Sequence, residues 1–290
     1  MTTTARDDTR RAEPNAIHTV RGGSRLRLHV REWGRPDGPP ILFLHGWSQN
    51  HLCWTHQYDS TMADEFRLVA CDLRGHGMSD APPEPEHYTD GQRWADDVAA
   101  ILDELHLDRP TLVGWSYGAF VIGDFVRAHG QHRVGAINFV GGAVQLGPGA
   151  FGTLIGPGFL DHFADLTADD LPTNIRGLQA FLPRIVATPL PPEDFQTALC
   201  WNMAVPARIR ANLAARDLNF DDVLQTLQVP LLVSQGRADI VVLPAMAEHI
   251  HAIAPAAEIS WYDNVGHAPH LEQPARFNHE LAALTRRVHA

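Results

Sequence analysis

The strongest constraint on the fold is a set of short apolar runs that recur along the chain, each bounded by glycine, proline or polar residues. Such runs are typical of strands buried on both faces of a sheet. Between them, segments such as 90–105 and 273–288 space apolar residues three and four apart, which indicates helices with one buried face. Strands alternating with helices predict an α/β fold with a mostly parallel sheet and helices on both faces. The apolar runs are 40–46, 66–72, 110–115, 134–140, 229–236 and 257–263.

Three parts of the chain depart from this alternation. Residues 17–34 predict two short strands joined by a hairpin. Residues 147–227 show no strand pattern and are rich in Phe, Leu and Pro, so we interpret them as a helical cap inserted into a core domain of 17–146 and 228–290. The polar segment 1–16 lacks the apolar stretch of a signal peptide and predicts a disordered tail.

Composition excludes several classes of function. The net charge of −11 and pI of about 5.8 argue against a nucleic acid or an anionic membrane as partner and favour a cytoplasmic protein. All 23 basic residues are arginine, so enzymes that need a lysine amine, such as Schiff-base, pyridoxal-phosphate and Walker-type phosphate-loop enzymes, are excluded. Cys53, Cys71 and Cys200 are too far apart in sequence to predict a disulfide framework or a metal site.

The segment Gly114-Trp115-Ser116-Tyr117-Gly118 lies where a predicted strand meets a predicted helix. A turn this tight forces its central residue into a strained backbone conformation. Glycine is needed two positions to either side because a Cβ there would collide with the neighbouring strand or helix. The turn lifts the Ser116 hydroxyl above the sheet and leaves the next backbone N–H free, which predicts a nucleophile.

A serine nucleophile needs a general base that is oriented by an acid. Asp239 follows one apolar run and His267 follows the last, so both lie at carboxyl ends of predicted strands, where sites in open α/β sheets form. Asp263 is an alternative acid and His270 an alternative base, and we favour Asp239 and His267. The HxxH spacing of 267–270 lacks the HExxH pattern of a zinc site, so no metal is predicted.

The alkoxide formed by attack also needs N–H donors that are already in place. One is the backbone N–H of Tyr117. The second is expected from the loop after the 40–46 strand, where Gly46 lets the chain turn over the site and the N–H of Trp47 is the natural donor. The sequence therefore predicts an oxyanion hole built from two main-chain groups.

Taken in order, five motifs resemble those of the α/β-hydrolase superfamily, and the resemblance covers nearly the whole chain. They are His45-Gly46-Trp47, the loop 74–80, the segment 114–118, the segment 236–239 and the segment 265–274. The resemblance implies an eight-stranded, mostly parallel sheet with the cap inserted after the sixth strand. It also implies that Ser116 is the nucleophile, His267 the base and Asp239 its partner, with Trp47 and Tyr117 as oxyanion donors and no metal or organic cofactor.

Within the superfamily, the resemblance favours small esterases and lactonases, near the cofactor-free haloperoxidase (perhydrolase) group. Haloalkane dehalogenases and epoxide hydrolases carry an aspartate where Ser116 stands, and the segment 147–227 holds none of the tyrosines that epoxide hydrolases use. Perhydrolases often carry proline where Ser48 stands. An acyltransferase, a cofactor-free dioxygenase and a non-catalytic small-molecule receptor of the same fold stay open as alternatives.

The substrate is expected to be a small molecule with a hydrophobic group, such as a medium-chain ester or an acyl lactone, because the cap contributes many large apolar side chains. The oligomeric state is left open, with a homodimer as one alternative. The residues expected to bind the substrate are His45, Gly46, Trp115, Phe159, Phe181 and Trp201.

Overall fold

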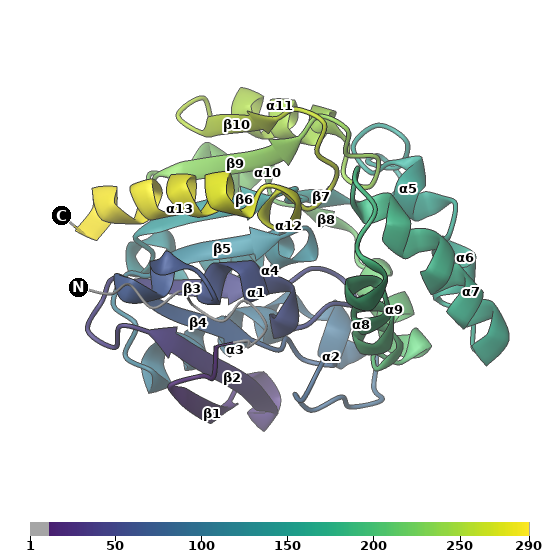
Figure 1. The fold of residues 1–290 in the computed structure, drawn as a ribbon, viewed down its shortest axis with the longest axis horizontal. Coiled ribbons are helices and arrows are strands. Elements are labelled where there is room, and N and C mark those ends of the chain that lie inside the picture. The colour runs from purple at the N-terminus through teal and green to yellow at the C-terminus, as the bar shows by residue number, and fades with distance from the viewer. Residues whose placement is uncertain (1–11, 290) are drawn as a thin grey trace, which may run out of the picture.

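The computed structural model describes residues 12–289, whose centre is an eight-stranded sheet in the order β1-β2-β4-β3-β5-β6-β9-β10 (Figure 1). The strands from β4 to β10 pair in parallel, whereas β2 is antiparallel to both of its neighbours. The predicted eight-stranded, mostly parallel sheet is thereby confirmed. The strands are β1 Ala16–Arg21, β2 Arg27–Gly34, β3 Pro40–Leu44, β4 Arg67–Cys71, β5 Thr111–Trp115, β6 Ala136–Val140, β9 Leu231–Gly236 and β10 Glu258–Tyr262.

The register of the central strands brings the predicted site loops together. Leu44, the last residue of β3, pairs with Gly114 in β5, so the chain leaves both strands at the same edge of the sheet. Trp115 pairs with Val140 in the next strand, β6. Loops that are distant in the sequence therefore begin side by side, as expected at the carboxyl ends of parallel strands.

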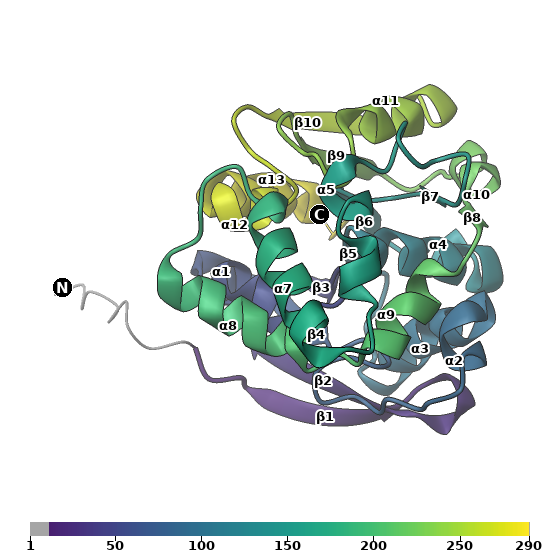
Figure 2. The same cartoon turned by 90° about the vertical axis from the view of Figure 1, so that its right-hand side faces the viewer.

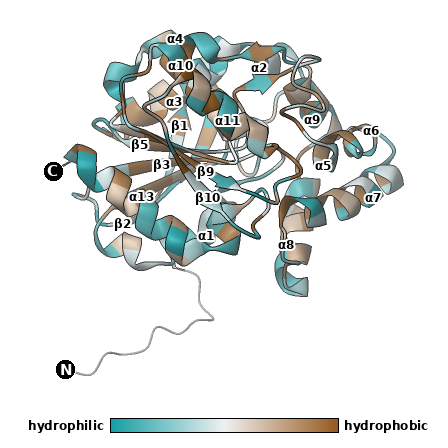
Figure 3. Cartoon of the chain, turned by 90° about the horizontal axis from the view of Figure 1, so that it is seen from above, coloured by the Kyte–Doolittle hydropathy of each residue, from teal (hydrophilic) through white to brown (hydrophobic). Residues whose placement is uncertain are grey.

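Helices cover both faces of the sheet. Figure 3 shows α3, α4 and α11 on one face and α1 and α13 on the other, with the hydrophobic strands between these two layers. Every residue of β5 and β6 is buried, because each face of these strands packs under a helix layer. The helices of these layers are α1 Thr55–Tyr58, α3 Gly91–Glu104, α4 Tyr117–His129, α11 Pro244–Ile253 and α13 Pro274–His289.

Most helices of the segment between β6 and β9, called the cap below, lie beyond the carboxyl ends of the strands (Figures 1 and 2), whereas the helix over 221–225 lies beside α4 (Figure 3). The exact limits of the cap, expected at 147 and 227, stay a prediction. The remaining helices of the described chain, most of them in the cap, are α2 Glu86–Thr89, α5 Pro157–Leu160, α6 Phe163–Leu166, α7 Leu171–Phe181, α8 Pro192–Met203, α9 Ala207–Ala214, α10 Asp221–Gln225 and α12 Pro269–Glu272.

The sequence predicts no strand within 147–227, and this prediction is wrong. Strand β8, Leu218–Asn219, lies in that range and pairs antiparallel with β7, Gln145–Leu146. The two strands join the beginning of the cap to its end. Two residues are too few to show the alternation of apolar and polar side chains that marks a strand in a sequence.

The predicted boundary of the disordered tail at residue 16 is also wrong, because β1 begins at Ala16. Before it, the Asn15 N–H donates to the Glu32 carbonyl oxygen at 2.7 Å, and the Trp33 indole donates to the Ala12 carbonyl oxygen at 3.0 Å. These contacts fix the segment against β2. Residues 1–11 of the predicted tail lie outside the described residues.

Between residues 12 and 289, no helix combines the length and apolar character needed to cross a membrane. The three cysteines are free thiols, with Cys53 and Cys71 buried and Cys200 exposed.

Candidate active site

Ser116 lies in a sharp turn between β5 and α4, with φ 53° and ψ −111°. Non-glycine residues rarely adopt this backbone region, and such strain is frequent at functional sites. A Cβ on Gly114 would lie 2.7 Å from the carbonyl carbon of Gly118, and one on Gly118 would lie 2.3 Å from the backbone oxygen of Leu44. Because the chain packs this closely on either side of the turn, positions 114 and 118 both require glycine.

His267 and Asp239 form a buried pair in the loops that follow β10 and β9. The His267 Nδ1 atom lies 2.8 Å from the Asp239 Oδ2 atom. The other carboxylate oxygen of Asp239 accepts the backbone N–H groups of Val241 at 2.8 Å and Val242 at 3.0 Å. Because these bonds fix the carboxylate, it can hold the imidazole in one orientation with Nδ1 as the donor.

The main chain of His267 is also held on both sides. Its N–H donates to the carbonyl oxygen of Ile185, which belongs to the cap, at 2.9 Å. Its carbonyl oxygen accepts the indole N–H of Trp115 at 2.9 Å. The position of the imidazole thus depends on the cap and on the residue that precedes Ser116.

The alternative acid and base lie elsewhere. Asp263 is exposed and pairs with Arg237 at 3.0 Å. His270 is buried, and its ring packs against those of Trp54 and Trp115, with centroids 4.4 and 4.7 Å away. Burial lowers the pKa of His270 well below its ordinary value, so the ring is a neutral part of the core.

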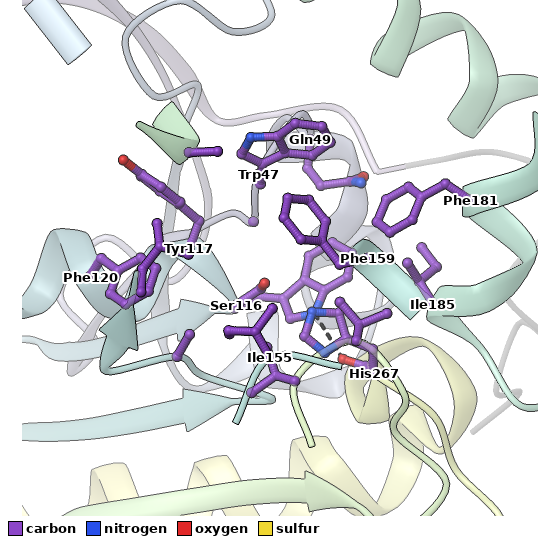
Figure 4. Close-up of a pocket in the computed structure, with 17 residues that line it drawn as sticks. Trp47, Gln49, Ser116, Tyr117, Phe120, Ile155, Phe159, Phe181, Ile185 and His267 are labelled. Carbon is purple, nitrogen blue, oxygen red and sulfur yellow. Dashed lines mark hydrogen bonds between the residues drawn. The ribbon is translucent and has the colours of Figure 1, made fainter. Parts of the chain in front are cut away.

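A largely apolar cavity lies between these loops and the cap (Figure 4). Ser116 and His267 both line it, and so do four of the residues expected to bind substrate: Gly46, Trp115, Phe159 and Phe181. Its other lining residues are Trp47, Gln49, Tyr117, Phe120, Ala143, Leu146, Ile155, Ile185, Ala214, Val241 and Val242.

The two expected N–H donors also belong to this cavity. Tyr117 is the first residue of α4, so its N–H has no acceptor inside the helix. Trp47 follows β3 in a turn that is closed by the Gln49 N–H and the Gly46 carbonyl oxygen at 3.2 Å. Within the described chain, no group accepts a hydrogen bond from the backbone N–H of Trp47. Both N–H groups are therefore available to a ligand.

Two expected substrate-binding residues, His45 and Trp201, do not line the cavity. His45 is fully buried, where its Nδ1 contacts the Gly46 carbonyl oxygen at 2.9 Å and its Nε2 accepts the Leu73 N–H at 2.9 Å. Burial lowers the pKa of His45 to about 3, so it is a neutral ring that joins the loops after β3 and β4.

Trp201, in α8, does not line the cavity but donates its indole N–H to the side-chain oxygen of Gln49 at 2.8 Å. Gln49 itself lines the cavity but was missed in the sequence analysis. Its place three residues after Gly46, in the loop expected to carry an oxyanion donor, was the available signal.

The described residues contain no group of three or more His, Cys, Asp or Glu side chains that could hold a metal ion.

Comparison with known proteins identifies the family to which a chain with this fold belongs. The model of the alpha/beta hydrolase family matches residues 41–280, so the chain belongs to this family. A solved structure of an esterase from Rhodococcus sp. ECU1013 is 33% identical with a TM-score of 0.87, over 94% of this chain and 99% of that one.

Two curated proteins are similar over most of the chain. AB hydrolase superfamily protein YisY of Bacillus subtilis is 26% identical over 92% of this chain and 98% of its own length. A pimeloyl–acyl-carrier-protein methyl ester esterase of Vibrio cholerae is 26% identical over 87% of this chain and 96% of its own length.

Proposed function

We propose that this protein is a serine hydrolase that cleaves a carboxylic ester or lactone through an acyl-enzyme on Ser116. The observation that carries the proposal is the buried His267–Asp239 pair at 2.8 Å, whose imidazole lines the same apolar cavity as Ser116. The similarity to the Rhodococcus esterase supports the choice of an ester bond.

In the proposed reaction, His267 takes the proton of Ser116 as the hydroxyl oxygen attacks the carbonyl carbon. The backbone N–H groups of Trp47 and Tyr117 donate to the resulting alkoxide, and loss of one such donor typically raises the barrier by about 3–4 kcal/mol. His267 then protonates the leaving alcohol. Water, activated by the same imidazole, cleaves the acyl-enzyme and restores Ser116.

The substrate is proposed to carry a hydrophobic acyl or alcohol group, because side chains such as Phe120, Ile155, Phe159 and Phe181 form most of the cavity. A series of p-nitrophenyl esters of increasing chain length tests this point. Turnover is expected to be highest for a medium chain, and a strict preference for acetate would contradict the proposal. Including lactone and amide substrates in the same panel identifies the bond that is cleaved.

Covalent labelling tests the nucleophile directly. A fluorophosphonate probe is expected to label wild-type protein and not Ser116→Ala, and ester hydrolysis by this variant is expected to fall by at least about 10⁴-fold. A folded wild-type protein that neither reacts with the probe nor hydrolyses any ester would support the non-catalytic receptor instead. Adding a competing alcohol or thiol acceptor distinguishes an acyltransferase, because the acyl group would then leave on the acceptor.

A further inference from the structure

The cavity that holds Ser116 contains few polar side chains, and most of them already have partners within the protein. The indole N–H of Trp47 donates to the carbonyl oxygen of Arg210 at 3.1 Å. The indole N–H of Trp115 donates to the carbonyl oxygen of His267 at 2.9 Å. Both tryptophans therefore present only ring carbons to a ligand.

The hydroxyl of Tyr117 is likewise engaged away from Ser116, as Figure 4 shows. It donates to the carbonyl oxygen of Leu213 and accepts a hydrogen bond from Arg216, each at 3.4 Å. Apart from Ser116 and His267, this leaves Gln49 as the polar side chain of the cavity lining that can still bond to a ligand.

Trp201 fixes which end of the Gln49 amide is free. An indole N–H can only donate, so the Gln49 atom at 2.8 Å from it must be the carbonyl oxygen Oε1. The amide nitrogen Nε2 then lies 3.4 Å from the Oδ1 atom of Asn202. Nitrogen Nε2 carries two hydrogens, and within the described chain Asn202 is its one acceptor. Within the described chain, one N–H of Gln49, a residue that is only 3% exposed, is thus left without a partner.

This free N–H lies among apolar groups. Figure 4 places the amide end of Gln49 beside Phe159 and Phe181, on the far side of the cavity from His267 in that view. A buried amide donor without an acceptor is unfavourable, and a ligand that supplies an acceptor oxygen there removes this penalty. A ligand that has only hydrocarbon beside the Gln49 amide does not remove this penalty.

We propose that Gln49 is a specificity-determining residue that donates a hydrogen bond to an oxygen of the substrate remote from the bond that is cleaved. The preferred substrates are then hydrophobic esters or lactones that carry an ether, carbonyl or hydroxyl oxygen in their acyl or alcohol chain. Trp201 acts through Gln49 as a positioning residue. The inference rests on the proposed ester hydrolase function.

The test uses two pairs of esters that differ by one oxygen in place of a methylene. On the acyl side, p-nitrophenyl 3-ethoxypropanoate is compared with p-nitrophenyl hexanoate, and on the alcohol side 2-ethoxyethyl acetate is compared with pentyl acetate. The ratio of kcat/KM within each pair is measured for wild type, Gln49→Leu and Trp201→Phe. Dividing the variant's ratio by that of the wild type cancels the intrinsic reactivity of the substrates.

In at least one pair, Gln49→Leu is expected to lower the ether-to-alkyl ratio by about 3- to 10-fold, the range of one neutral hydrogen bond. Trp201→Phe is expected to lower the same ratio by a smaller factor, because Gln49 stays but loses its orientation. The matched control is Gln225→Leu, the same substitution at an exposed glutamine at the end of α10 that does not line the cavity, and it is expected to leave the ratio as it is in wild type.

Unchanged ratios for both pairs in Gln49→Leu would overturn the proposal and leave Gln49 as a link between the loop after β3 and the cap. Should Gln49→Leu fail to fold, an unchanged ratio in Trp201→Phe would have the same meaning. These results are separate from those for the proposed function, which fails if Ser116→Ala hydrolyses all four esters at wild-type rates.

Discussion

The indole N–H of Trp115 donates a 2.9 Å hydrogen bond to the main-chain carbonyl oxygen of His267. Trp115 immediately precedes Ser116, whereas His267 lies in the loop after β10, more than a hundred positions further along the chain. The bond joins the candidate nucleophile and the candidate base without using either reactive atom. Their relative position is therefore fixed before a substrate arrives, as preorganised catalysis requires.

Trp115→Phe tests how much this hydrogen bond contributes to stability and to the reactivity of Ser116. The variant loses one buried hydrogen bond and part of a fully packed ring, so the free energy of unfolding should fall by about 2–3 kcal/mol. The rate at which a fluorophosphonate labels Ser116 should fall by about tenfold, because His267 is less well placed. Stability is measured by urea unfolding and labelling by gel fluorescence. A destabilised variant with the wild-type labelling rate would mean that Trp115 has no part in placing the base.

Asp239→Asn should abolish most of the activity while preserving the shape of the site. An amide at this position no longer holds the imidazole of His267 with Nδ1 as the donor, and loss of this function costs up to about 10⁴-fold in kcat in serine hydrolases. Asp263→Asn is the matched control, since Asp263 is exposed and pairs with Arg237. Its kcat should equal that of the wild type. Equal losses in the two variants would show that Asp239 is not the specific partner of the base.

Gly118→Ala should destabilise the fold as well as the site. The added methyl group would lie 2.3 Å from the backbone oxygen of Leu44, and neither α4 nor β3 can move away cheaply. We expect the free energy of unfolding to fall by about 3 kcal/mol or more. Gly149→Ala provides the control, because a Cβ at Gly149 has no atom within 4 Å. Similar unfolding curves for the two variants would contradict this account of the turn.

Protein stability should decrease as the pH falls from about 6.5 toward 3, in part because of His45. Its pKa is about 3 in the folded protein, owing to burial, and about 6.5 in the unfolded chain. Between these values the unfolded chain takes up a proton that the folded protein does not, so acid favours unfolding. Asp124, whose pKa burial raises to about 6, acts in the opposite direction between about 3.8 and 6.

His45→Gln isolates this contribution. The slope of unfolding free energy against pH between 4 and 6 should decrease by up to about 1.4 kcal/mol per unit relative to the wild type. Urea unfolding at four pH values measures both slopes. Parallel plots for the two proteins would show that His45 is not the buried neutral group described here.

The sheet could be predicted because each strand is a short apolar run with a clear boundary. The run 110–115 became β5, Thr111–Trp115, and 257–263 became β10, Glu258–Tyr262. Ser116, Asp239 and His267 could be proposed for a related reason. Each follows a strand in a loop, so its place at the edge of the sheet is fixed by local sequence.

What could not be predicted depends on packing between distant segments. His45 precedes a loop of the site, yet its ring turns into the core to accept the Leu73 N–H. Trp201 is an aromatic residue of the cap, like Phe159, but it bonds to Gln49 and does not line the cavity. For Gln49 the sequence offers only its place in the loop after β3, because the role of an amide side chain depends on partners that come from distant segments.

The bond from the His267 N–H to the carbonyl oxygen of Ile185 limits how this enzyme scaffold can be rebuilt. A different segment inserted between β6 and β9 would change the walls of the cavity. It would also remove the Ile185 carbonyl oxygen, which accepts the hydrogen bond from the His267 N–H. A working chimaera therefore has to reproduce that one oxygen atom in space, whatever the rest of the graft contains.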